Sequence, residues 1–500
     1  MRGRVSIAKL LLGRRLKNSE SETRKIGVFA GVPAMGLDGL GSSAYGPEAA
    51  LTVLMPLGAA GLAHIEPVTL AVLGLLGILY LSYRQTISAF PNGGGAYVVA
   101  RENLGPFAGL LAATALMLDY VLNVAVGISA GVGALVSAVP ALHPWTLTLC
   151  LVILALITVI NLRGTTEAGL VFSVPTYLFV ASFALVIGIG LWRLVGSGGH
   201  PQPVVPPPPL AGATEAVSLW RLLRAFASGC TAMTGVEAVS NGVTAFREPR
   251  ERNAQRTLTF IVVVLGALLG GIALLAGAYD IGAMDQTKPG YQSVLSQLAG
   301  AVVGRGWLYD GAMGSLLAIL CLSANTSFVG FPRLCRTVAQ DGYLPKGFTL
   351  VGRRLVYSVG ILFLTVASGG LLIAFGGITD RLIPLFAVGA FLAFTMSQAG
   401  MVFHWRRMLR QGKGRHSHFA LAANALGTVT TAGALAVIIA AKFIEGAWIT
   451  ALVIPCTLAL LKAIRHHYDS IDAAVWETGP LRLRNLGSSK FCVIEQKLSG

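Results

Sequence analysis

Four acidic residues lie inside long apolar stretches of the sequence: Asp38, Glu48, Asp119 and Glu237. A charge at the centre of a bilayer is costly, so such residues normally face a cavity or a partner. The sequence places no Lys or Arg at comparable depth. The acids must therefore bind a cation, or some of them must stay protonated because desolvation disfavours the charged form. A proton-coupled cation carrier would use both options in turn.

Neutral oxygen atoms accompany these acids. Asp119-Tyr120 is followed by Asn123, one helical turn further on, so the three side chains can share one face of a helix. Tyr45 and Thr234 add hydroxyl groups close in sequence to the other acids. Oxygen-rich coordination of this kind suits a weakly hydrated alkali cation. The residue types therefore indicate a cationic substrate or a cationic coupling ion.

Some of these polar residues also have a structural interpretation. A buried hydrogen bond between helices would account for Asp119, and a position near the outer surface would account for Glu48, which follows Pro47. Asn325 and Thr326, in a separate apolar stretch, are interpreted first as hydrogen-bonding groups between helices.

Two apolar stretches contain residues that weaken a helix. Residues 35–47 include four glycines, two serines and a proline, and residues 228–237 include two glycines. Unwound backbone at membrane depth survives only where it is buried in protein or lines a cavity. We therefore predict broken-helix backbone at Gly41, Ser42 and Gly235. Interruptions at matching positions of two halves indicate a transporter site, although membrane helices also tolerate glycine.

The composition places these residues in a helical membrane protein. Of 500 residues, 54% are hydrophobic and 12% are charged, against about 25% charged in soluble domains. The mean hydropathy is +0.70. Apolar runs of about twenty residues recur, and each can cross a hydrocarbon core of about 30 Å. An all-α integral membrane protein is predicted, which excludes secreted, nucleic-acid-binding and ordinary cytosolic proteins.

We predict twelve membrane spans within a transmembrane domain at 27–464. A basic segment at 1–26 precedes this domain, and a short tail at 465–500 follows it. A segment as short as this tail rarely folds alone, so we expect no cytosolic regulatory domain there. The predicted spans are 27–57, 67–85, 105–138, 145–162, 168–192, 218–245, 257–279, 307–332, 355–375, 382–404, 419–441 and 444–464.

The basic residues predict how the chain is oriented. The formal net charge is +16, and with a cytoplasmic N-terminus 31 of the 38 Lys and Arg residues fall in inside segments. Basic residues concentrate on the cytoplasmic side, so both termini are predicted to be cytoplasmic. The same charge can hold anionic lipid headgroups. The positive charge is thereby explained without a nucleic-acid partner.

The sequence carries no recognisable catalytic constellation, so we expect neither an enzyme nor a bound cofactor. The stretch from Gly127 to Gly131 matches the nucleophile-elbow pattern, but it lies inside an apolar helix without histidine. We interpret Gly127 and Gly131 as a close helix-packing face. Zinc-ligand spacing, a Walker A sequence and a potassium-channel filter are all absent from the sequence.

The motifs around the acids resemble the amino acid–polyamine–organocation superfamily of secondary transporters. Within it they are similar to the KimA-like branch of potassium–proton symporters, relatives of Kup. The likeness covers roughly residues 25–470. The matching pieces are Leu37-Asp38, Ser42-Ser43-Ala44-Tyr45-Gly46, Tyr83-Arg84-Gln85-Thr86-Ile87, Pro91-Asn92-Gly93-Gly94-Gly95-Ala96-Tyr97, Asp119-Tyr120, Asn161-Leu162-Arg163-Gly164, Ser228-Gly229-Cys230, Thr234-Gly235-Val236-Glu237-Ala238, Ala324-Asn325-Thr326 and Asp341-Gly342-Tyr343-Leu344-Pro345.

This resemblance implies a fold and a function. It implies a LeuT-type 5+5 inverted repeat with spans one and six broken, a homodimer in the cell membrane, and proton-driven potassium import by alternating access. Potassium would be the only metal, as a transported ion. Glu237 would be the proton-coupling carboxylate, with Asp38 or Asp119 as sharers. The ion-binding residues carried over by position are Asp38, Tyr45, Asp119, Tyr120, Asn123 and Thr234.

The sequence departs from the branch at three site positions. Asn123 replaces a threonine, Gly127 a serine and Phe386 a tyrosine. Because Gly127 and Phe386 each remove a hydroxyl, a larger cavity is expected, which favours an amino acid or polyamine permease as the alternative. Asp38 would repel a substrate carboxylate, so a cationic amine fits that alternative better. The branch's cytosolic nucleotide-binding domain, through which a cyclic dinucleotide inhibits it, is expected to be absent here.

Overall fold

Helix α7 (Pro106–Ala138) runs through the middle of the molecule and is buried along most of its length. It packs mainly against α14 (Trp307–Gln340) and α16 (Thr379–Arg410). The computed structural model describes residues 25–93, 95–163, 168–210, 212–350, 357–412 and 417–477. Within these ranges the chain is helical, with one isolated β-bridge between Ile26 and Phe246.

The other helices surround this central group. Their bounds are α2 (Val28–Met35), α3 (Leu37–Leu54), α4 (Ala59–Leu62), α5 (Ile65–Ala89), α6 (Ala96–Leu104), α8 (Thr146–Leu162), α9 (Ala168–Gly196), α10 (Leu219–Gly229), α11 (Ala238–Asn241), α12 (Arg250–Ala278), α13 (Val294–Val303), α15 (Ser358–Ala374), α17 (Ser417–Lys442) and α18 (Trp448–Glu477). The short 3₁₀ helices are η2 (Met55–Leu57), η3 (Pro140–Trp145), η4 (Cys230–Met233), η5 (Val243–Ala245) and η6 (Lys346–Thr349), and η7 (Phe443–Ala447) is a π-helical turn.

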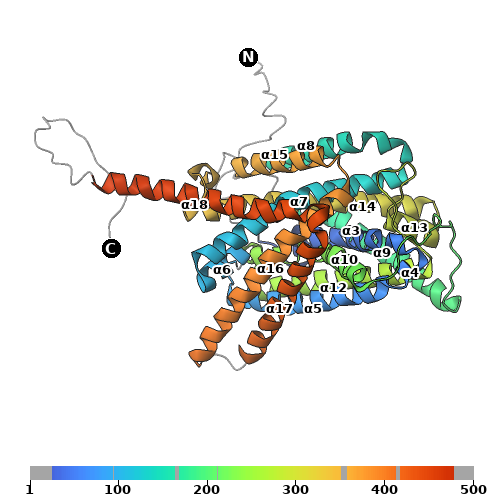
Figure 1. The fold of residues 1–500 in the computed structure, drawn as a ribbon, viewed down its shortest axis with the longest axis horizontal. Coiled ribbons are helices and arrows are strands. Elements are labelled where there is room, and N and C mark those ends of the chain that lie inside the picture. The colour runs from blue at the N-terminus through green and yellow to red at the C-terminus, as the bar shows by residue number, and fades with distance from the viewer. Residues whose placement is uncertain are drawn as a thin grey trace, which may run out of the picture.

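Figure 1 shows how these helices are arranged. α16 and α17 lie side by side, and α8 and α15 form another pair along one edge of the bundle. α18 runs past the bundle and extends well beyond it. Part of the predicted C-terminal tail, residues 465–477, is therefore a continuation of this helix. The rest of that tail, and the basic segment at 1–24, lie outside the described residues.

Eight helical stretches of the described chain are long and apolar enough to cross a membrane. They are Ala59–Ala89, Pro106–Ala138, Pro140–Leu162, Phe172–Gly196, Arg250–Ala278, Trp307–Gln340, Thr379–Arg410 and His418–Ala473. The predicted spans at 27–57 and 218–245 consist of shorter helices, and α15 has only 17 residues. The all-helical membrane architecture is confirmed, while the count of twelve stays a prediction. The sequence also missed α13, because its ten residues are too few to span.

Glycines allow α7 and α14 to approach closely. A Cβ atom on Gly131 would lie 2.8 Å from Cys321 Sγ, and one on Gly127 would lie 2.5 Å from Ser323 Oγ. Small residues at such contacts let helix backbones pack tightly in a membrane. The predicted role of Gly127 and Gly131 as a packing face is confirmed.

The first interruption separates α2 from α3 at Gly36. A Cβ atom there would lie 2.7 Å from Ile261 Cδ1 on α12, so only glycine allows this approach. The sequence predicted unwound backbone at Gly41 and Ser42, but both residues lie inside α3. Ser42 Oγ sits 2.6 Å from the carbonyl oxygen of Ala232 in η4 and 2.7 Å from that of Gly39. Ser42 therefore provides a hydrogen bond to the second interruption while its own helix continues.

The second interruption follows α10, which ends at Gly229 and gives way to η4. Regular α-helix resumes only at α11. Gly235 lies between η4 and α11 with a φ of +81°, a left-handed conformation that favours glycine. A Cβ atom on Gly235 would lie 2.6 Å from the backbone nitrogen of Gly39 and 2.7 Å from Asp38 Cβ. This non-helical backbone, predicted at Gly235, packs directly against the first turn of α3.

Candidate functional site

Three of the four predicted acids lie in one neighbourhood. Asp38 is in the first turn of α3, Asp119 is in the middle of α7, and Glu237 precedes α11 at the second interruption. Their exposed fractions are 4%, 1% and 3%. Each carboxylate lies within electrostatic range of the other two. The interrupted helices and α7 therefore collect three buried acids in one region, which the sequence predicted only as separate residues.

These acids are incompletely satisfied within the described part of the chain. Asp38 Oδ1, Asp119 Oδ1 and Glu237 Oε2 each lack a hydrogen-bond partner there. None of the three forms an ion pair with a described Lys or Arg. A buried charge in this situation is strongly unfavourable unless a cation or a proton neutralises it. The region is therefore suited to exchanging positive charge.

The three carboxylates do not form one compact metal centre. Among the described residues, no group of three or more His, Cys, Asp and Glu side chains is arranged to hold a metal ion. A cation here would instead contact one or two carboxylates together with neutral oxygens. Such weak, mixed coordination allows an ion to leave again, as transport requires.

Two predicted hydroxyl residues meet beside the acids. Tyr45 Oη on α3 and Thr234 Oγ1 at the second interruption are 3.2 Å apart, and both side chains are buried. Thr234 also donates to the carbonyl oxygen of Thr231, at 3.1 Å. α3 and the second interruption thus supply one hydroxyl pair, although 189 residues separate its members.

Helix α14 contributes two serines that the sequence analysis missed. Asn123 Nδ2 donates to Ser327 Oγ at 2.9 Å, whereas Asn123 Oδ1 has no partner among the described residues. Ser323, four residues before Ser327, places its hydroxyl beside Gly127. The four-residue spacing of Ser323 and Ser327 in an apolar stretch could have indicated that both serines share one face of a helix.

The expected enlargement of the cavity is wrong at both positions. The hydroxyl of Ser323 occupies the space that a Gly127 side chain would need. Phe386 is fully buried, and its ring centroid lies 6.2 Å from that of Tyr45. Ser323 of α14 and the Phe386 ring therefore occupy the space that the two missing hydroxyl groups were expected to leave open.

Glu48, the fourth acid, lies apart from the others. Its Oε1 accepts a hydrogen bond from Tyr291 Oη at 2.5 Å. Together with Asp380 it lines a small pocket of about 20 Å³. Glu48 therefore belongs to a different region, here called the outer mouth after the predicted orientation. Its lining includes Glu48, Ala134, Gln286, Tyr291, Thr379 and Asp380.

Lys442 falls in the connection between the predicted spans 419–441 and 444–464, but the structure buries it. Its side chain is 1% exposed at the end of α17. The π-helical turn η7 carries the chain into α18, and its residues Phe443 and Ile444 are exposed, whereas the Lys442 side chain is buried. The charged groups that influence Lys442 are Arg224 and Asp380, not the three acids. One basic residue therefore does lie deep in the protein, away from the acids.

A cavity of about 600 Å³ opens on the other side of Tyr120. We call it the inner vestibule, after the orientation that the basic residues predict; it is lined mainly by α14 and by residues of the segments 89–93 and 95–98. Tyr120 Oη accepts a hydrogen bond from Asn241 Nδ2 at 3.2 Å. A Cβ atom on Gly330 would lie 2.8 Å from Tyr120 Oη. Tyr120 also lies within electrostatic range of Glu237 and Asp119, so it borders both the vestibule and the acids.

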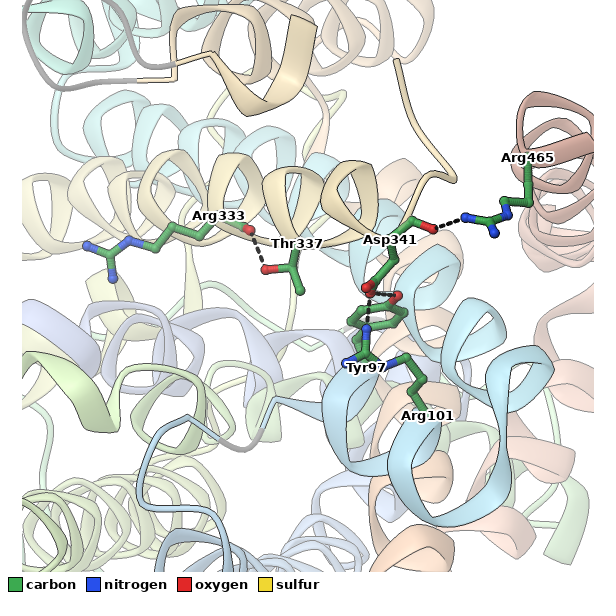
Figure 2. Close-up of polar contacts among 6 residues, drawn as sticks. All are labelled: Tyr97, Arg101, Arg333, Thr337, Asp341 and Arg465. Atoms are coloured by element: carbon green, nitrogen blue, oxygen red, sulfur yellow. Dashed lines mark hydrogen bonds and ion pairs between the residues drawn. The ribbon is translucent and has the colours of Figure 1, made fainter. Parts of the chain in front are cut away.

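One side of the vestibule is held by a cluster around Asp341, shown in Figure 2. The Tyr97 hydroxyl and the Arg101 guanidinium, both from α6, contact the Asp341 carboxylate. Arg465 Nη1 on α18 donates to the Asp341 carbonyl oxygen at 2.8 Å. Burial and the carboxylate together raise the pKa of Tyr97, so its hydroxyl stays protonated and donates. Asp341 thus joins α6, the end of α14 and α18.

Comparisons with known proteins place the chain in a family. The family model described as amino acid permease matches residues 39–458. The chain is 40% identical over 469 residues to the potassium transporter KimA of Bacillus subtilis (strain 168), covering 93% of this chain and 75% of that protein. The chain belongs to the amino acid permease family of the amino acid–polyamine–organocation superfamily.

Two further relatives are more distant. The chain is 23% identical over 322 residues to the low-affinity putrescine importer PlaP of Escherichia coli (strain K12), covering 59% of this chain and 68% of that protein. It is 25% identical over 369 residues to the branched-chain amino acid permease BcaP of Lactococcus lactis subsp. cremoris (strain MG1363), covering 67% and 73%. The superfamily predicted from the motifs is confirmed, and its members are transporters rather than enzymes.

Proposed function

We propose that this protein is a secondary active transporter that imports potassium ions together with protons. The observation that carries the proposal is the group of three buried acids, each with an unpartnered oxygen and no basic partner among the described residues. The similarity to a potassium transporter over 93% of the chain supports potassium as the cation.

The acids and the nearby neutral oxygens have different roles in the proposed transport. In this proposal Asp38 and Asp119 hold the cation together with neutral oxygens of Tyr45, Tyr120, Asn123 and Thr234. Glu237 takes the proton, because it lies at the non-helical second interruption and within electrostatic range of both other acids. Neutralising one carboxylate by a proton while a cation sits on the others removes most of the cost of the buried charge.

The finer fold belongs to the same proposal. The domain at 27–464 would contain twelve spans in a LeuT-type 5+5 inverted repeat with spans one and six broken, between cytoplasmic segments at 1–26 and 465–500. The two observed interruptions and the family membership support this arrangement. The protein would be a homodimer in the cell membrane. Access would alternate as one group of helices rocks against the other.

Growth on low potassium tests the proposal. We expect the intact protein to rescue a bacterium that lacks its own potassium uptake systems. The Asp38→Asn variant should lower the uptake rate by about 100-fold or more, because one ionic contact of the cation is lost in a desolvated site. Glu66→Gln is the matched control, since Glu66 is an exposed acid at the start of α5. Failure of the intact protein to rescue growth would reject potassium as the substrate.

A cationic amine is the second candidate substrate. The putrescine importer among the relatives and the 600 Å³ vestibule favour it, whereas the space filled by Ser323 and Phe386 opposes it. Thermal unfolding of the purified protein with potassium, sodium or putrescine separates the two. Stabilisation by putrescine alone would favour this second candidate, because a ligand that binds only the folded state raises the unfolding temperature.

A further inference from the structure

Arg333 stands at the boundary between the acids and the inner vestibule. It follows Gly330 by three residues on α14, so it lies on the same face one turn further along. Gly330 faces Tyr120, the residue that borders both regions. Arg333 lines the vestibule, and its side chain is exposed to that space.

The Arg333 guanidinium is not used in a structural ion pair within the described chain. Figure 2 shows it pointing away from Asp341, whose carboxylate already contacts Tyr97 and Arg101. The groups within electrostatic range of Arg333 are the hydroxyls of Tyr120 and Tyr357. Its charge therefore acts on the vestibule itself.

The vestibule has the opposite electrostatic character to the acid region. Besides Arg333, its charged and titratable lining residues are Glu102, His404 and Arg407. Arg407 Nη2 donates to Asn103 Oδ1 at 3.2 Å. A cation that passes Tyr120 thus moves from a region of uncompensated carboxylates into a cavity lined by two arginines and one glutamate.

We propose that Arg333 is an electrostatic gate that lowers the occupancy of the inner vestibule by the transported cation. This inference rests on the proposed function, because it requires a cationic cargo. A fixed positive charge in a cavity with protein walls is weakly screened, so it repels a cation more strongly than it would in bulk water. A lower cation occupancy of the vestibule slows rebinding to the acids from that side, which makes Arg333 a positioning residue for cation binding at the vestibule face.

Membrane vesicles of known orientation test this gate. Everted vesicles expose the vestibule side under the proposed orientation, and right-side-out vesicles expose the outer mouth. The measurement is exchange of radioactive rubidium against potassium, with the half-saturating potassium concentration determined at each face. For Arg333→Gln we expect this concentration to fall about threefold to tenfold at the vestibule face. At the other face it should change less than about twofold.

Three controls separate a charge effect from a structural one. Arg333→Lys keeps the charge and should behave as the unaltered protein. Arg336→Gln removes a charge from the same helix but outside the vestibule, because Arg336 does not line that cavity and donates to Tyr357 Oη at 2.5 Å. This variant should leave the half-saturating potassium concentration unchanged at both faces. Raising choline chloride from about 0.01 M to about 1 M should shrink the difference between Arg333→Gln and the unaltered protein, because salt screens the guanidinium.

The outcomes are distinct for the two proposals. If the unaltered protein exchanges no rubidium, the cation-transport proposal fails and this inference fails with it. If the unaltered protein exchanges rubidium but Arg333→Gln leaves the half-saturating potassium concentration at the vestibule face unchanged, only the gate proposal is rejected. Equal shifts in Arg333→Lys and Arg333→Gln would also reject it. Should Arg333→Gln fold poorly, Arg333→Met provides the same charge removal with a side chain of similar reach.

Discussion

The inner vestibule and the outer mouth lie on opposite sides of the acids and differ sharply in size. The vestibule holds about 600 Å³, whereas the outer mouth holds about 20 Å³. The outer mouth is closed by the segment between α12 and α13: Tyr291 donates to Glu48, and Gln286 Nε2 donates to Tyr291 Oη at 3.3 Å. Gln286 Oε1 accepts a further bond from the Asp380 backbone, at 3.3 Å.

This difference shows that the larger of the two cavities borders the acid region at Tyr120, whereas the pocket beside Glu48 is small. The outer side is closed by several hydrogen bonds from one connecting segment, whereas the inner side has the single Tyr120–Asn241 pair beside the acids. A carrier needs barriers that open alternately, while a channel needs a continuous path. The asymmetry therefore fits the carrier, and it can be tested at each barrier separately.

The largest expected effect is a difference in chemical access. A cysteine at Thr337, in the vestibule wall, should react with a membrane-impermeant maleimide about 100-fold faster than a cysteine at Ala134, a buried residue of the outer mouth. Reagent is applied from the facing side in oriented vesicles. The background is the reactivity of the chain with only its own six cysteines. Equal rates at the two positions would contradict this difference in access.

A smaller effect is expected at the inner barrier. Gly330→Ala places a methyl group 2.8 Å from Tyr120 Oη and should lower the uptake rate about tenfold, because Tyr120 must move away from Asn241. Gly314→Ala, on the same helix with no atom within 4 Å of the new methyl group, should retain full uptake. Rubidium uptake by whole cells measures both variants. Equal loss in both would indicate damage to α14 instead of to the barrier.

The smallest effect is expected at the outer barrier. Tyr291→Phe removes the hydrogen bond to Glu48, and the net contribution of a typical hydrogen bond is about 1 kcal/mol. The closed outer mouth should open more often, and the cysteine at Ala134 should react about fivefold faster. Tyr309→Phe is the control, because it removes a buried hydroxyl contact at 2.8 Å from Ser296, which does not line the outer mouth. An unchanged labelling rate in Tyr291→Phe would show that this bond does not hold the mouth closed.

The helical membrane class and the choice of acids could be read from the sequence alone. Hydropathy is a property of each stretch by itself, so the bounds of α7 were predicted closely, and the existence of α12 and α16 was predicted although both helices extend beyond the apolar spans. A carboxylate in an apolar run is costly whatever it packs against, so Asp38, Asp119 and Glu237 were conspicuous before any helix was placed. The glycine content likewise indicated that both interrupted regions exist.

Only the tertiary structure decided which residues meet. The first interruption lies at Gly36 because of contact with Ile261 on α12, a partner more than 200 residues away. Three other features depend in the same way on which helices are neighbours. They are the contact of Ser323 with Gly127, the hydrogen bond of Tyr97 to Asp341 and the burial of Lys442. In a membrane every helix satisfies its own backbone, so sequence periodicity carries little information about its neighbours. The sequence therefore determined where buried charge must be neutralised, and helix packing determined which residues and cavities surround that charge.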